Sequence, residues 1–163
     1  MRKSILLFAA LLVTSPALFA QGNKSVFFEI GGNGIGFSGN FDGRFSKKEN
    51  GLGFRAGIGF VPGTADNGLI DFSTILTIPV GLNYVAGKGP HHFEAGLGAT
   101  YVSGSFSLLD SDEEKGSGVG FVPSGGYRYA SPEKGLQARV FISPFFGSGG
   151  SVFWAGLSIG YKF

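Results

Sequence analysis

Apolar and polar residues alternate strictly along the last part of this chain. In residues 151–163 every odd-numbered position from Phe153 to Phe163 is apolar, whereas the even-numbered positions from Trp154 to Lys162 carry glycine, serine, lysine and one tryptophan. A period of two residues is typical of a β-strand whose two faces meet different surroundings. The pattern therefore predicts a strand with one continuous apolar face.

The same alternation divides the rest of the chain into strands separated by turn-forming residues. With the terminal segment, eight strands are predicted, at 25–32, 35–45, 51–60, 69–85, 92–102, 118–129, 136–146 and 151–163. Asn33-Gly34 predicts a type I′ hairpin turn, because both central residues of that turn need positive φ. Ile35 and Phe37 are expected on the apolar face of the second segment. An alternative merges the first two segments into one long strand and leaves seven.

The charged residues support this division. Once the apolar face of each segment is assigned, the charges within the segments fall on the opposite face: Glu29, Asp42, Arg44, Arg55, Asp71, Glu94, Arg128, Arg139 and Lys162. A cationic side chain facing hydrocarbon costs about 2–4 kcal/mol at mid-depth. An apolar face exposed to lipid explains why no charge lies on it.

A sheet that spans a membrane must close, because each unpaired backbone group in lipid costs several kcal/mol. The expected fold is therefore all-β: an eight-stranded antiparallel transmembrane β-barrel with up-and-down meander topology. An even strand number places both termini on one side, expected to be the periplasm. Periplasmic turns are then expected at 47–50, 86–91 and 130–135, and extracellular connections at 33–34, 61–68, 103–117 and 147–150.

Aromatic residues and prolines add detail to this barrel. Outward aromatic residues are expected near both ends of the strands, with Phe45, Tyr84, Phe93, Tyr129 and Phe163 at one end and Phe60, Phe72, Tyr101 and Phe146 at the other. Such rows resemble the aromatic girdles of membrane barrels. Proline removes a ladder donor, so bulges or breaks are expected at Pro79, Pro123 and Pro144.

The first twenty residues have the layout of a secretory signal peptide. Arg2 and Lys3 precede the apolar run 5–13, which is followed by Pro16 and small residues. This run is too short to cross a hydrocarbon core of about 30 Å. Cleavage is expected after Ala20 or Ala17, and residues 21–163 are expected to form the barrel domain.

Composition excludes several classes of protein. Without Arg2 and Lys3 the chain has equal numbers of basic and acidic residues, and it has no cysteine. Nucleic-acid binding, a disulfide framework, a thiolate metal site and a lipoprotein anchor are therefore not expected. Thirty glycines and eighteen phenylalanines suit a narrow sheet cylinder surrounded by lipid.

The inward charges are the candidate chemistry. Glu29 and Glu94 are expected to pair with Arg55, Arg128 and Arg139 as a structural ion network in the barrel interior, because unpaired buried charges are costly. A binding or catalytic carboxylate is the alternative. Inward bulk from Phe141, Phe145 and Trp154 argues against an open pore, since the interior of an eight-stranded barrel is just filled by side chains.

His91 and His92 are the only histidines, and both are expected at a periplasmic turn. Neighbouring strand residues point to opposite sides, so the pair is a poor metal clamp. No cofactor or metal is expected.

The sequence resembles a family of small outer-membrane β-barrels of the outer-membrane protein A and X type. The resemblance is carried by the signal peptide, the eight alternating segments, the stretch PVGLNY (79–84) and the ending WAGLSIGYKF. It implies residence in the outer membrane, contact with its lipids, and recognition of the terminal strand, through Tyr161 and Phe163, by the barrel-assembly machinery.

We therefore expect a non-enzymatic barrel that supports envelope integrity or displays loops. One alternative is an adhesin or receptor that binds an extracellular ligand through 61–68 and 103–117, where Asp110, Asp112, Glu113 and Glu114 lie. The other is an enzyme that modifies lipids of the outer leaflet.

Overall fold

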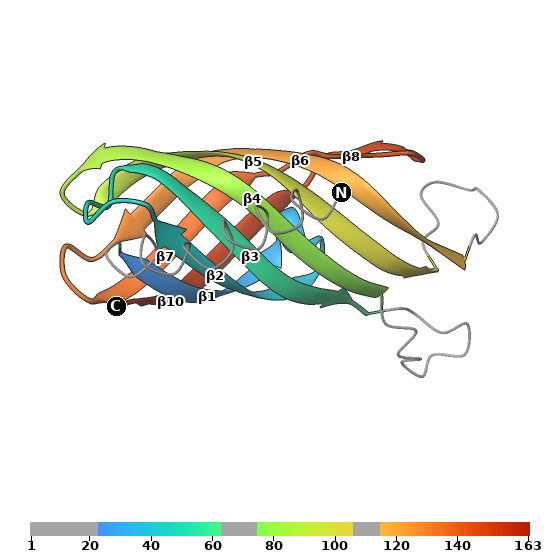
Figure 1. Cartoon of the computed structure of the whole chain (residues 1–163), viewed down its shortest axis with the longest axis horizontal. Coiled ribbons are helices and arrows are strands. Elements are labelled where there is room, and N and C mark those ends of the chain that lie inside the picture. Colours follow the sequence, from blue (N-terminus) through green and yellow to red (C-terminus); the bar gives the residue numbers. More distant parts are fainter. Residues whose placement is uncertain (1–22, 63–74, 106–114) are drawn as a thin grey trace, which may run out of the picture.

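The chain forms a closed antiparallel β-barrel of eight spanning strands (Figure 1). The computed structural model describes residues 23–62, 75–105 and 115–163. Its strands are β1 (Lys24–Gly31), β2 (Phe37–Arg44), β3 (Gly51–Val61), β4 (Ile75–Lys88), β5 (His91–Ser105), β6 (Lys115–Ala130), β7 (Gly135–Ile142), β8 (Phe145–Gly147), β9 (Gly150–Val152) and β10 (Ala155–Lys162), and a 3-10 turn, η1, covers Gly32–Gly34. Among the described residues no helix is long and apolar enough to cross a membrane.

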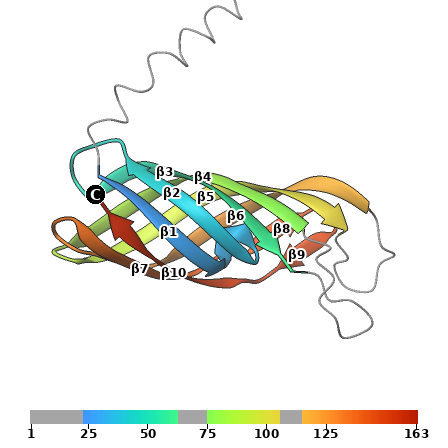
Figure 2. The ribbon, with the colours of Figure 1, turned by 90° about the horizontal axis from the view of Figure 1, so that it is seen from below.

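Each strand pairs with its neighbours in the chain, and β1 closes the cylinder by pairing with β10. β7 and β8 together make up one spanning strand, and β9 and β10 make up another. The ten strand segments therefore form eight spanning strands. The eight-stranded meander is thus confirmed, and the seven-strand alternative is wrong. Both described chain ends lie at the same end of the barrel, where the backbones of Lys24 and Phe163 bond to each other (Figure 2). We call this the terminal end, with turns at 45–50, 89–90 and 131–134, and the opposite one the loop end.

The predicted faces agree with the structure along most strands. On β4, for example, Leu82 and Tyr84 are more than half exposed, whereas Thr77 and Asn83 are buried. Most of the predicted outward aromatic residues are exposed: Phe45, Tyr84, Phe93 and Phe163 at the terminal end, and Phe60, Tyr101 and Phe146 at the loop end. Tyr129 is half-buried. Phe72 lies outside the described residues, as do residues 1–22, where the signal peptide is predicted.

Ile35 does not follow its predicted face. Instead of a two-residue hairpin turn at Asn33-Gly34, the chain forms η1 and folds into the barrel, with positive φ at Gly31, Gly32 and Ile35. Ile35 is buried with Val102, Val122 and Phe145, and does not begin the outward row of β2. At these residues the backbone leaves the extended conformation, so side chains no longer point alternately inward and outward. For this reason the two-residue period placed Ile35 on the wrong face.

The prolines interrupt the ladders without shifting the register. Between β3 and β4 the pairs Ala56–Val80 and Gly59–Thr77 share one register, but the two positions between them, opposite Pro79 and Ile78, are unpaired. Pro144 separates β7 from β8. By register it lies opposite Pro123, because Gly125 pairs with Ile142 and Phe121 with Phe146. Because the two prolines face each other, the backbone N–H groups that both lack are missing from the same position of the ladder.

The predicted connection 103–117 is shorter than expected. β5 runs to Ser105 and β6 begins at Lys115, and the two pair without interruption over this length. The stretch is rich in serine and glycine, so no apolar alternation marked it as strand. The acidic residues at 110–114 lie outside the described residues.

Candidate functional site: the charged barrel interior

The inward face of the barrel holds most of the charged side chains of the described strands. All but one of the predicted inward charges are described, and each is at most 9% exposed: Glu29, Asp42, Arg44, Arg55, Glu94, Arg128, Arg139 and Lys162. The five residues predicted as an ion network are among them. Asp71 lies outside the described residues.

Two arginines form the centre of the larger cluster. Arg128 on β6 and Arg139 on β7 are direct cross-strand partners, and like charges in that position repel. Glu94 of β5 lies 3.0 Å from Arg128 and 3.4 Å from Arg139. Asp42 of β2 lies 3.3 Å from each arginine. One carboxylate from the neighbouring strand β5 and one from β2 across the barrel therefore hold together a pair of cations that would otherwise destabilise the sheet.

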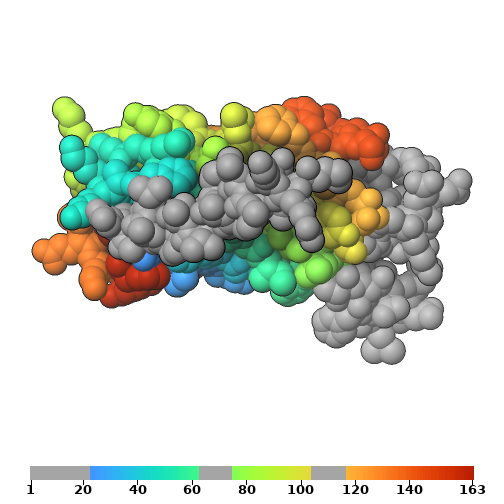
Figure 3. Space-filling view, viewed as in Figure 1, coloured from blue at the N-terminus to red at the C-terminus, as the bar shows by residue number. Residues whose placement is uncertain are grey.

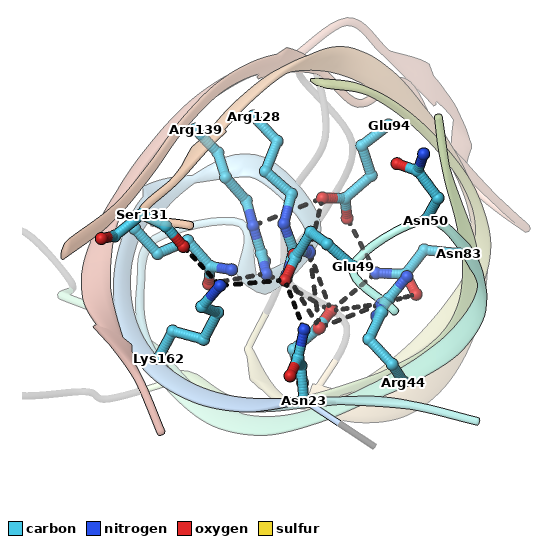
Figure 4. A network of polar contacts seen from close by, with 12 residues as sticks. Asn23, Arg44, Glu49, Asn50, Asn83, Glu94, Arg128, Ser131, Arg139 and Lys162 are labelled. Carbon is cyan, nitrogen blue, oxygen red and sulfur yellow. Dashed lines mark hydrogen bonds and ion pairs between the residues drawn. The ribbon is translucent and has the colours of Figure 1, made fainter. Parts of the chain in front are cut away.

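Asp42 is the most connected carboxylate of this cluster. It also forms an ion pair with Arg44 at 2.9 Å. Asn83 on β4 donates to Asp42 at 2.7 Å and to Glu94 at 2.8 Å. Arg44 in turn donates to the Asn83 side-chain oxygen. Figure 4 shows these side chains converging on the barrel axis from β2, β4, β5, β6 and β7.

Glu49 reaches the cluster from the turn at 45–50 and covers it at the terminal end. Its carboxylate lies 2.7 Å from Arg128 and 3.6 Å from Lys162, and Asn23 donates to it at 3.2 Å (Figure 4). Lys162 also donates to the backbone oxygen of Ser131. The interior is therefore capped by a turn residue that no strand alternation could identify.

A second, smaller cluster lies toward the loop end. Arg55 of β3 and Glu29 of β1 form an ion pair at 2.5 Å. The Arg55 guanidinium lies 5.2 Å from the ring centre of Phe27 and 5.9 Å from that of Phe141, distances at which a cation is attracted to an aromatic face. The second oxygen of Glu29 accepts from the backbone of Gly34 in η1 at 3.2 Å.

The inward turn η1 fills the next layer. The Asn33 carbonyl accepts from Thr100 at 2.7 Å, and its side-chain oxygen accepts from Ser143 at 2.6 Å. Thr77 donates to the Gly34 carbonyl at 2.9 Å. Above η1, at the loop end, Ile35, Val102, Val122 and Phe145 form an apolar cluster against which Trp154 packs.

The space beside Arg55, Glu94 and Arg139 leaves little room for a ligand. A cavity of about 10 Å³ lies between Arg55, Glu94 and Arg139, which is the space that one water molecule needs. Each carboxylate on the strands is held by at least one arginine. The arrangement can stabilise the barrel and hold its strands in place, but this cavity gives a substrate no room beside a carboxylate.

The two histidines lie at the terminal end and point to opposite sides. His92 is buried, whereas His91 is exposed and bonds to the Tyr127 hydroxyl at 2.6 Å. Within the described ranges no group of three or more acidic or histidine side chains could hold a metal ion.

The two residues predicted as an assembly signal lie away from this interior. Tyr161 and Phe163 are exposed on the outer face at 53% and 45%. The loops predicted for the adhesin alternative lie mostly outside the described residues.

Sequence reasoning left several members of the network out of the predicted five. Asp42 and Arg44 had the inward alternation of the predicted five, and could have been included on that signal. Asn83 also had it, but carries no charge. Glu49 lies in a turn, so its inward direction depends on the path of the backbone beyond Arg44.

No protein-family model matches the chain, and no curated protein matches it significantly. Among solved structures, it is similar to the N-terminal β-barrel domain of OprF from Pseudomonas aeruginosa. The TM-score is 0.58 at 13% sequence identity, over 86% of this chain and 96% of that one. At this identity the similarity shows the fold.

Proposed function

We propose that this chain is an integral outer-membrane β-barrel with a closed interior and a structural role in the cell envelope. The observation that carries the proposal is the distribution of apolar and charged side chains between the outer and inner faces of the barrel. Large apolar residues such as Ile58, Leu97 and Ile159 are about 60% exposed on the outside, whereas the charges are buried and paired inside. A protein in water would favour the reverse distribution.

The closed interior supports a structural role, because two successive layers obstruct the barrel axis. The paired cluster around Asp42 lies toward the terminal end, and η1 with its apolar cluster lies toward the loop end. Breaking a buried ion pair by removal of one partner costs about 3–5 kcal/mol, so the network resists opening. The fold similarity to the OprF barrel domain supports the barrel itself.

The outer face of β10 is a candidate binding site for one partner. We propose that the barrel-assembly machinery recognises this strand through Tyr161 and Phe163. Tyr161 on β10 and Phe163 just after it both expose their side chains on the outer face, at the strand that pairs with β1 to close the barrel. Phe163→Ala is expected to lower the amount of assembled barrel, measured against the buried-face control Ser158→Ala.

The test combines gel mobility, fractionation and conductance. The folded protein should resist SDS until it is boiled, shift its band on boiling, and fractionate with outer membranes. It should show no stepwise conductance in a planar bilayer. A deletion strain should be more sensitive to detergents than its parent. A band that does not shift, from a protein soluble in the periplasm, would refute the membrane barrel, whereas regular conductance steps would refute the closed interior.

A further inference from the structure

Exposed charged side chains gather at the terminal end of the barrel. Of the described residues, the charged ones with exposed side chains are Lys47, Lys48, Lys88, Lys134 and Glu133. We call the four lysines the lysine ring. At the loop end, no side chain that the structure describes is charged. The terminal end therefore carries four exposed lysines and one exposed acid.

The charge of the lysine ring is not neutralised within the described part of the protein. None of the four ammonium groups forms an ion pair or a side-chain hydrogen bond there. Glu49, which is next to Lys48 in sequence, turns away into the barrel and binds Arg128 and Lys162 instead. Glu133 is the one exposed acid against four exposed lysines, so the ring keeps a net positive charge.

The lysine ring lies just beyond the outward aromatic residues of the terminal end. Its members come from the β2–β3 turn, the β4–β5 hairpin and the β6–β7 turn, which project at one end in Figure 3. Phe45 precedes Lys47 by two residues, and Tyr84 precedes Lys88 by four. The aromatic side chains of Phe45 and Tyr84 are both exposed on the outer face. Aromatic rings of this kind lie at the membrane–water interface. The lysines just beyond them are therefore at the depth of lipid phosphates.

We propose that the lysine ring binds the headgroups of anionic phospholipids in the membrane leaflet at the terminal end. Lysine is a flexible point charge suited to phosphate, and each basic residue near an anionic membrane surface contributes about 1 kcal/mol, or about fivefold in affinity. An acidic polysaccharide would favour basic side chains across the whole end of the barrel, whereas the four lysines lie on its turns and the centre is occupied by Glu49 paired with Arg128 and Lys162. The proposal rests on the membrane location proposed above.

The experiment uses the full mature chain, folded in a neutral detergent and titrated with phosphatidylglycerol or with phosphatidylcholine of the same acyl chains. Native mass spectrometry counts the lipids that remain bound. The unsubstituted protein should prefer phosphatidylglycerol at least tenfold in low salt, and the preference should shrink in 0.5 M salt, where the Debye length is only about 4 Å.

Charge variants assign the preference to the ring. In K47Q/K48Q/K88Q/K134Q the preference should fall to near parity. The matched control Glu133→Gln, at the same end, should raise it, because it removes the exposed acid of that end. Equal binding of both lipids by the unsubstituted protein, or an unchanged preference in the fourfold variant, would overturn the proposal. So would retention on isolated peptidoglycan without any lipid preference, because that would assign the ring to a polysaccharide.

Gel mobility keeps the two proposals separate. A variant that still shifts its band on boiling has a closed barrel, so a lost preference in that variant reports on the lysines. If the unsubstituted barrel is heat-modifiable and resides in the outer membrane but has no lipid preference, the lysine ring proposal alone fails. If it does not enter the membrane, the proposed function fails as well.

Discussion

At the scale of single residues, the interior depends on a few carboxylates shared between several cations. Asp42 and Glu94 each contact both Arg128 and Arg139, which face each other across a strand pair. A buried carboxylate of this kind offsets repulsion between two cations as well as forming pairs of its own. Its removal should therefore cost more than the loss of one ion pair at the surface.

Asp42→Asn tests this role. The substitution keeps the shape but removes the charge shared by Arg44, Arg128 and Arg139, so we expect the free energy of unfolding to fall by about 3–5 kcal/mol. Urea unfolding of the barrel in lipid vesicles measures the change.

The control for this variant is Glu133→Gln, since Glu133 is an exposed acid with no ion pair among the described residues. Its effect should stay within about 0.5 kcal/mol. Equal losses in the two variants would show that Asp42 is no more important than a surface charge.

At the scale of elements, η1 determines how the loop end is closed. Two features favour glycine at position 32: its φ is 62°, and a Cβ there would lie 2.5 Å from the Phe141 ring. The same segment buries Ile35 and Asn33 between the strands. The turn is therefore part of the packed interior and differs in kind from the turns at the terminal end.

Gly32→Ala should destabilise the barrel for two reasons, the left-handed backbone and the contact with Phe141. The backbone contribution is about 1–2 kcal/mol for a residue with a Cβ. Gly89 offers a matched control, because its φ of 60° is close to the 62° of Gly32, yet a Cβ there would meet nothing within 4 Å. We expect the unfolding free energy to fall further for Gly32→Ala than for Gly89→Ala, and equal losses would contradict a packed η1.

At the scale of the whole molecule, the barrel presents an apolar outer surface and a polar interior. Leu97 lies mid-strand, paired with Leu82 and Pro123, and is 62% exposed. In lipid this position is at the depth where charge is costly, but in water it would tolerate charge. The energetic effect of a charge at this position therefore depends on the surrounding solvent.

Leu97→Arg should cost about 2–4 kcal/mol in a bilayer, whereas Leu136→Arg, beside the turn at 131–134, should cost about 0–1 kcal/mol. Both positions are at least half exposed, so their difference reports on depth. Unfolding titrations in vesicles measure it. Two equal and small costs would show that the outer face meets water.

The sequence alone was sufficient for the strand number, for the face of most residues and for the burial of the charges. These properties follow from the two-residue period of the backbone, which is local, and from the cost of a charge in lipid. Glu29, Arg55, Glu94, Arg128 and Arg139 could each be assigned to the interior without knowledge of any contact.

Only the tertiary structure decided which charges meet. Asp42 is the direct cross-strand partner of Arg55, yet Arg55 pairs with Glu29 of β1 and Asp42 pairs with arginines across the barrel. Partners depend on the stagger of the closed strands and on side-chain reach, and neither is local. The inward positions of Glu49 and η1 could not be predicted for the same reason. Both lie outside the strands, where alternation gives no direction, and their partners come together only in the closed barrel.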